Sequence, residues 1–198
     1  MRNGIIKKLY HGSHAHGIER LLPYSKLHGT DVNVVYLTDS YPYSLFYIWD
    51  SEHNLKKGKH VTAWIRDGIV YYEEQFPRQL EAFYKGVKGY VYVVEDSDEF
   101  AEVDERESMW YSEKEACIAS VELIEDVYDE IMKCSADGRI KIIPFEEVPA
   151  QKIKELHERM ASGIVRRGLL RTEKDPEAEF YKRFFPKAWM MAHNEVTP

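Results

Sequence analysis

Three short segments in the first quarter of the chain carry residues whose types and order could form one binding pocket. The residues are, in chain order, His11, Gly12, Ser13, Tyr36, Ser44 and Tyr47. The first three place an imidazole, a backbone without a side chain and a hydroxyl next to one another at the end of an apolar run. Aromatic rings offer flat surfaces, and the imidazole and hydroxyls can hydrogen-bond an amide or a sugar. The pattern predicts a pocket for a flat ligand that carries such groups.

Two strands and a helix must position these six residues. Residues 5 to 12 predict the first strand, with a sharp turn at its end, and residues 34 to 38 predict the second. Between them, residues 14 to 33 contain many turn formers and predict a loop. A helix should follow, because Asp39 or Ser40 can cap its N-terminus. The last two of the six residues are three positions apart, which is the spacing of one helix face.

The rest of the chain alternates between strand and helix patterns. The clearest signals are a hairpin around Arg66-Asp67-Gly68 and a strand of β-branched and aromatic residues at 89 to 95. Further segments are predicted as a helix from Pro77, an acidic surface loop at 95 to 107, a strand-turn-strand at 110 to 121, a helix at 126 to 134 and a strand at 140 to 144. Apolar residues recur at helical spacing after Pro149. We therefore expect an α+β domain over residues 1–148 and a helical C-terminal extension over residues 149–198, packed on the same domain.

Composition limits the class of protein. The 198 residues fit one domain with an appendage, and a hydrophobic content of 44% is ample for a packed core. A net charge of -7 argues against a nucleic-acid backbone as the main partner. Cys117 and Cys134 form neither a disulfide framework nor a zinc-ligand spacing. With no signal-peptide pattern and no apolar run near the roughly 20 residues of a membrane helix, we expect a cytoplasmic protein without a membrane partner.

The order of the site residues resembles the ADP-ribosyltransferase superfamily. The similarity is to its His-Tyr-Glu branch, which includes the diphtheria-toxin-like enzymes and the poly(ADP-ribose) polymerases. Tyr36 and Tyr47 are eleven residues apart with Ser44 between them, a spacing similar to that of the polymerases. Tyr111-Ser112-Glu113, which runs into an apolar stretch, is similar to the strand that carries the catalytic Glu of the family. The resemblance implies a split β-sheet core of two small, packed, antiparallel-rich sheets with flanking helices.

The resemblance also implies a substrate and a reaction. NAD would be the substrate, without a metal, and ADP-ribose would pass to a protein, a nucleic acid or a small molecule. His11 would bond a ribose hydroxyl, Gly12 and Ser44 would hold the carboxamide, and two tyrosine rings would sandwich the nicotinamide. The implied catalytic residues are His11, Tyr36 and Glu113, and the implied NAD-binding residues are His11, Gly12, Ser13, Tyr36, Ser44 and Tyr47. A carboxylate suits this reaction because it stabilises the positive charge that develops on the ribose as nicotinamide leaves.

Several alternatives stay open at the level of sequence. Glu107, Glu113 and Glu115 lie close together in the chain, and any one of them could face the pocket. The same fold could serve an NAD glycohydrolase, an RNA 2'-phosphotransferase-like enzyme, or a non-catalytic domain that binds a nucleotide or a partner. His14 and His16 lie near His11, but surface loop positions explain them better than a metal site does.

Overall fold

The computed structural model describes residues 8–95, 100–104, 106–172 and 174–196. The chain forms two compact units. The first comprises Met1–Trp49, Val61–Tyr72 and Tyr84–Ile142, and the second comprises Asp50–His60, Glu73–Phe83 and Ile143–Pro198. All predicted catalytic and NAD-binding residues belong to the first unit. The C-terminal helices share the second unit with two short segments from earlier in the chain, and the predicted domain boundary after residue 148 stays a prediction.

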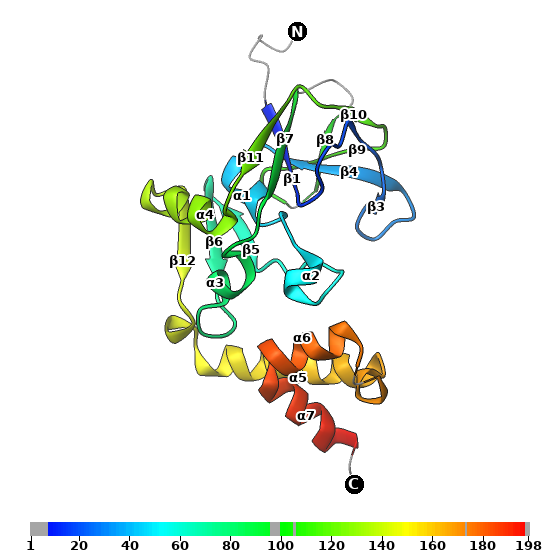
Figure 1. Cartoon of the computed structure of the whole chain (residues 1–198), viewed down its shortest axis with the longest axis vertical. Coiled ribbons are helices and arrows are strands. Elements are labelled where there is room, and N and C mark those ends of the chain that lie inside the picture. The colour runs from blue at the N-terminus through cyan, green and yellow to red at the C-terminus, as the bar shows by residue number, and fades with distance from the viewer. Residues whose placement is uncertain (1–7, 96–99, 105, 173, 197–198) are drawn as a thin grey trace. The chain divides into compact units, whose positions relative to one another are not determined.

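A seven-stranded antiparallel sheet forms the framework of the first unit (Figure 1). Its strands follow the order β11-β7-β1-β4-β9-β8, and β3 pairs with β4 beside this path. The strands are β1 (Lys8–Ser13), β3 (Ser25–Lys26), β4 (Asn33–Thr38), β7 (Gly89–Glu95), β8 (Ala101–Glu102), β9 (Met109–Ser112) and β11 (Ser120–Ile124). The predicted strands at 34 to 38 and 89 to 95 are confirmed. Residues 5–7 of the predicted first strand, and residues 96–99 and 105 of the predicted acidic loop, lie outside the described residues.

The remaining strands form two smaller sheets. β2 (Arg20–Leu21) pairs with β10 (Ala116–Cys117), and a three-stranded sheet has the order β12-β6-β5. The strands of the latter are β5 (Ala63–Arg66), β6 (Ile69–Glu73) and β12 (Ile140–Ile143). The turn between β5 and β6 has φ angles of 52° at Asp67 and 73° at Gly68, the left-handed pair that a two-residue hairpin turn requires. The predicted hairpin is therefore confirmed, and with it the α+β class with antiparallel sheets.

The alternation of side chains along β1 and β4 decides which face of the sheet each site residue occupies. One face carries the hydrophobic cluster Leu9, Leu21, Val35, Leu37, Val94, Trp110 and Ala116. Gly12 and Tyr36 alternate with members of this cluster, so they face the opposite side. There the helix α1 (Tyr41–Leu45) contacts β1 and β4, and α4 (Val127–Ala136) contacts α1 (Figure 1). The sheet therefore presents Gly12 and Tyr36 to α1, whereas His11 and Ser13 share the face of Leu9 by the same alternation.

The second unit is mainly helical. Its helices are α2 (Ser51–Asn54), most of α3 (Gln79–Tyr84), α5 (Ala150–Arg166), α6 (Pro176–Phe184) and α7 (Pro186–Val196), with short 3-10 turns at Phe145–Glu147 and Leu169–Arg171. The predicted helices after Pro149 are confirmed. The helix predicted from Pro77 instead begins at Gln79, because Arg78 has a φ of 58° and cannot be part of it. No helix in the described part of the chain combines the length and the apolar character that a membrane crossing needs.

Candidate functional site

The strands β1 and β4 separate where the predicted site begins. Their described register pairs Tyr10 with Thr38. If the antiparallel ladder continued, Gly12 would lie opposite Tyr36, two residues further along each strand. Instead, His11 Nδ1 lies 3.0 Å from the carbonyl oxygen of Tyr36. A carbonyl only accepts, so Nδ1 donates this hydrogen bond, and Nε2 of the neutral ring is then an acceptor. The imidazole thus takes the place of a ladder contact.

Gly12 packs directly against the backbone of α1. A Cβ atom on Gly12 would lie 1.9 Å from the carbonyl oxygen of Ser44 and 3.2 Å from Cγ1 of Ile48. No side chain fits in this space, because real Cβ atoms do not approach other atoms so closely. The sequence suggested that a ligand amide approaches this glycine. The structure adds a reason that does not depend on a ligand, since the helix itself requires the bare backbone.

Gly12 contacts Ser44, and Ser44 in turn contacts Tyr47. Ser44 is 1% exposed, and its Oγ donates to the carbonyl oxygen of Tyr41 at 2.7 Å. The backbone N–H of Tyr47 donates to the carbonyl oxygen of Ser44 at 3.1 Å. The predicted helix carries Ser44 but ends at Leu45, so Tyr47 lies in the tight turn that follows. The expectation that both residues share one helix face is therefore wrong in detail, although the turn keeps them adjacent.

The Tyr47 phenol is held in a neutral state. Its hydroxyl lies 3.2 Å from the hydroxyl of Tyr43, and the two rings meet edge to face with centroids 5.4 Å apart. Burial raises the pKa of Tyr47, and Tyr43 raises it further, while the positive charge of Arg106 acts in the opposite direction. A neutral, oriented ring of this kind suits stacking against a flat ligand.

The Tyr36 ring is fixed at its far end. Its hydroxyl accepts from the backbone N–H of His28 at 3.0 Å and donates to the carbonyl oxygen of Lys26 at 3.2 Å. In the sheet, Tyr36 lies opposite Tyr111 of β9. The remaining predicted residue, Ser13, uses its Oγ to accept from the backbone N–H of Ala15 at 3.2 Å. Ser13 therefore shapes the turn after β1, and its hydroxyl remains able to donate.

The three candidate carboxylates occupy different environments. Glu107 accepts from the backbone N–H groups of Gly68 at 2.7 Å and Asp67 at 3.2 Å, so it holds the β5–β6 turn. Glu115 forms an ion pair with Arg20. Glu113 is exposed just beyond β9, and within the described part of the chain it forms no hydrogen bond or ion pair. Of the three, Glu113 has the carboxylate that no described protein group engages.

The segment between β9 and β10 bends, so its carboxylates do not alternate as they would in a strand. A regular strand would place Glu113 and Glu115 on one face, but residues 113–115 belong to no strand. Ser112 Oγ instead accepts from the backbone N–H of Lys114 at 3.0 Å and stabilises the bend. The two carboxylates are therefore not constrained to point in the same direction.

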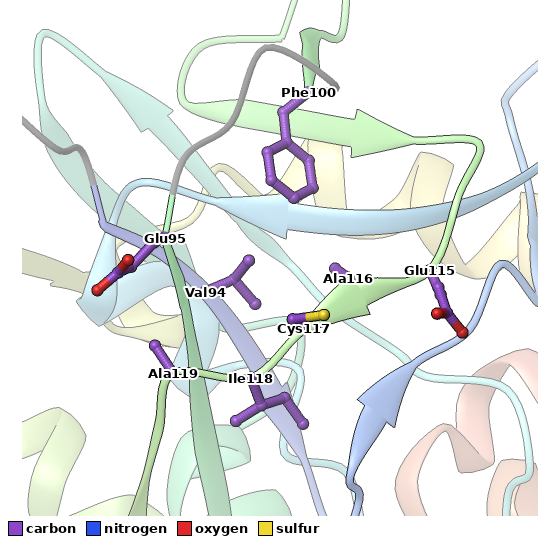
Figure 2. A pocket seen from close by; sticks show the side chains of 8 residues that line it. All are labelled: Val94, Glu95, Phe100, Glu115, Ala116, Cys117, Ile118 and Ala119. Atoms are coloured by element: carbon purple, nitrogen blue, oxygen red, sulfur yellow. The ribbon is translucent and has the colours of Figure 1, made fainter.

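Glu115 lines a separate hollow of about 400 Å³ (Figure 2). The lining residues are Val94, Glu95, Phe100, Glu115, Ala116, Cys117, Ile118 and Ala119. Figure 2 shows Glu95 and Glu115 at opposite ends, with Cys117 between them. None of the predicted NAD-binding residues lines this hollow. Its apolar floor belongs to the hydrophobic cluster of the sheet, so Glu115 is associated with that face.

Two features near the site were not predicted. Tyr43 contacts Tyr47 and Tyr111 lies opposite Tyr36, and the sequence predicted neither of these tyrosines as part of the site. Arg106 acts on Tyr47 through its charge, and it is the only basic residue between positions 95 and 107. Its isolation in an acidic stretch was a signal that could have identified it.

Comparisons with known proteins add no family to these observations. No family model matches the chain, and neither the curated proteins nor the solved structures contain a match. Among the described residues, no group of three or more His, Cys, Asp or Glu side chains is placed to hold a metal ion. The functional argument therefore rests on the geometry of the site.

Proposed function

We propose that this chain is an NAD-dependent ADP-ribosyltransferase. The observation that carries the proposal is the meeting of four predicted residues where β1 and β4 separate. His11 bonds the backbone of Tyr36 at 3.0 Å, and Gly12 lies so close to Ser44 that a Cβ would be 1.9 Å from its carbonyl oxygen. These residues come from two strands and a helix, so their convergence is a property of the fold. The separation of the strands also supports a split-sheet core of the ADP-ribosyltransferase type.

The chemistry of these groups fits the nicotinamide half of NAD. His11 is oriented by the bond from its Nδ1 to the Tyr36 carbonyl oxygen, and its imidazole is the group that we propose bonds a ribose hydroxyl. Tyr36 and Tyr47 supply rings fixed by hydrogen bonds to protein groups, so little conformational entropy is lost when a ligand stacks on them.

The proposed reaction breaks the bond between the nicotinamide nitrogen and C1' of the ribose. Nicotinamide leaves with the bonding electron pair, and positive charge develops on the ribose. The Glu113 carboxylate stabilises this charge, since neither a backbone turn nor an arginine engages it, unlike Glu107 and Glu115. An acceptor nucleophile then bonds to C1' and loses its proton. We place the reaction in the cytoplasm, where free thiols such as Cys117 and Cys134 remain reduced.

Nicotinamide release from NAD tests this proposal. The wild-type protein should release nicotinamide faster than a protein-free blank. Glu113→Gln keeps the shape of the side chain and removes its charge, and we expect a rate loss of about 100-fold or more. Glu195→Gln, an exposed position in α7, is the matched control and should leave the rate unchanged. Products identify the acceptor, because free ADP-ribose indicates transfer to water and therefore an NAD glycohydrolase.

Three results would reject the proposal or part of it. Absence of nicotinamide release together with absence of NAD binding by calorimetry would reject an NAD enzyme. Binding without release would instead favour the non-catalytic reading of the same fold. If Glu113→Gln still releases nicotinamide, another carboxylate stabilises the charge on the ribose.

A further inference from the structure

The loop between β8 and β9 is attached to the end of β4, next to the proposed NAD site. The carbonyl oxygen of Ser108 accepts from Thr38 Oγ1 at 2.7 Å and from the backbone N–H of Asp39 at 3.2 Å. Trp110 Nε1 donates to Asp39 Oδ2 at 3.0 Å and secures the same junction. Since Thr38 ends the strand that carries Tyr36, the loop is anchored two residues from that tyrosine.

The same loop is also anchored to the β5–β6 hairpin. Glu107 holds the two N–H groups of its turn, as described above. Ser108 has a φ of 61°, a left-handed conformation that a residue with a side chain adopts only when surrounding contacts impose it. These anchors directly after residue 106, together with the backbone hydrogen bonds of Arg106 to Val103 and Met109, fix the position from which its side chain extends.

Arg106 is the cation that this loop carries. It is exposed, and it forms no ion pair with any residue that the structure describes. The positive charge of Arg106 lowers the pKa of the Tyr47 phenol, against the rise that burial causes. The chain carries a net charge of -7, so most of the charged groups around this cation are acidic.

We propose that Arg106 binds the diphosphate of NAD. This inference rests on the proposed function, because it assumes that nicotinamide lies at Tyr36 and Tyr47. In NAD only one ribose separates the nicotinamide from the diphosphate, so a cation beside the nicotinamide platform is within reach of the phosphate oxygens. The planar guanidinium matches a phosphate through two parallel N–H donors. It also offsets the repulsion that a dianionic ligand meets at an acidic protein.

Calorimetric titrations with three ligands separate this role from a structural one. NAD and ADP-ribose contain the diphosphate, whereas nicotinamide lacks it. Arg106→Gln should weaken the binding of NAD and ADP-ribose by about tenfold or more, the range of a lost charge-assisted hydrogen bond. Nicotinamide affinity should stay within roughly twofold of wild type. Arg106→Lys keeps the charge and should recover part of the loss, and Arg159→Gln, an exposed arginine of α5, is the matched control.

The ligands also separate failure of this inference from failure of the proposed function. If wild-type protein binds NAD and Arg106→Gln binds it equally well, Arg106 does not contact the diphosphate, while the proposed function stands. If Arg106→Gln loses nicotinamide and NAD equally, the arginine only supports the Tyr47 ring, and the inference is rejected. If the wild-type protein binds neither ligand, the proposed function fails and the inference fails with it.

Discussion

Replacing Gly12 with alanine tests the packing on which the site depends. The added Cβ would lie 1.9 Å from the carbonyl oxygen of Ser44, and an ordinary contact begins at 3.4 Å. Either α1 or the end of β1 must therefore move by about 1.5 Å. The atom that it meets belongs to the backbone, so a change of side-chain rotamer cannot relieve the contact.

The cost follows from overpacking at a buried backbone. Insertions of this kind cost about 1–3 kcal/mol, which for a chain of this size lowers the melting temperature by roughly 2–12 °C. The movement also separates Gly12 and Ser44, the two groups proposed to hold the carboxamide. We therefore expect Gly12→Ala to lower stability and to weaken nicotinamide binding in the same protein.

Thermal unfolding and nicotinamide titration measure these two effects. Gly58→Ala is the matched control, because a Cβ there meets no atom within 4 Å. It should change the free energy of unfolding by less than about 0.5 kcal/mol and leave binding unchanged. A Gly12→Ala protein that has the melting temperature and the nicotinamide affinity of the wild type would refute the packing argument.

Three further predictions concern pH, a helix cap and a tyrosine hydroxyl. Burial lowers the pKa of His60 from 6.5 to about 4, so the folded state favours the neutral ring. This preference contributes about 3 kcal/mol of stability, which is fully present above pH 6.5 and should be lost as the pH falls to 4. Urea unfolding at several pH values should show this loss in the wild type but not in His60→Phe. Asp126 caps α4 and accepts from Gly86 N–H at 2.8 Å, so Asp126→Ala should cost about 1–2 kcal/mol in thermal unfolding, and an unchanged melting temperature would contradict this. Tyr36→Phe keeps the ring but removes its hydrogen bonds to Lys26 and His28, so the free energy of unfolding should fall by about 1 kcal/mol. Calorimetry should show a nicotinamide affinity within roughly threefold of the wild type. A larger loss of affinity would mean that the hydroxyl contacts the ligand.

Local signals in the sequence predicted the longer elements of the first unit, but the two-residue strands β2, β3 and β8 lie in segments predicted as loops. The β-branched run of β7 and the Asp67-Gly68 turn are recognisable because short-range preferences decide them. The end of α1 was missed because three consecutive short-range hydrogen bonds from Phe46 to Ile48 tighten the chain before Tyr47. No local preference encodes such an ending.

Long-range contacts explain what the sequence left open. Glu107 is committed to a turn forty residues earlier in the chain, which no spacing pattern reveals. The second unit groups His60 with Phe83, Phe180 and Phe185 through ring contacts at 5.5–5.9 Å, although these residues lie far apart in sequence. The order of the site residues suggested the roles that we propose for them. Which carboxylate remains unengaged became known only from the fold.

Nicotinamide release from NAD by the wild-type protein, compared with Glu113→Gln in the same assay, tests the central claim most directly. The claim is that the residues gathered where β1 and β4 separate bind nicotinamide and that Glu113 stabilises the charge left on the ribose. The account predicts release above the protein-free blank and its loss in Glu113→Gln, with Glu195→Gln active. Wild-type release no faster than the blank, with no heat of NAD binding, would contradict it.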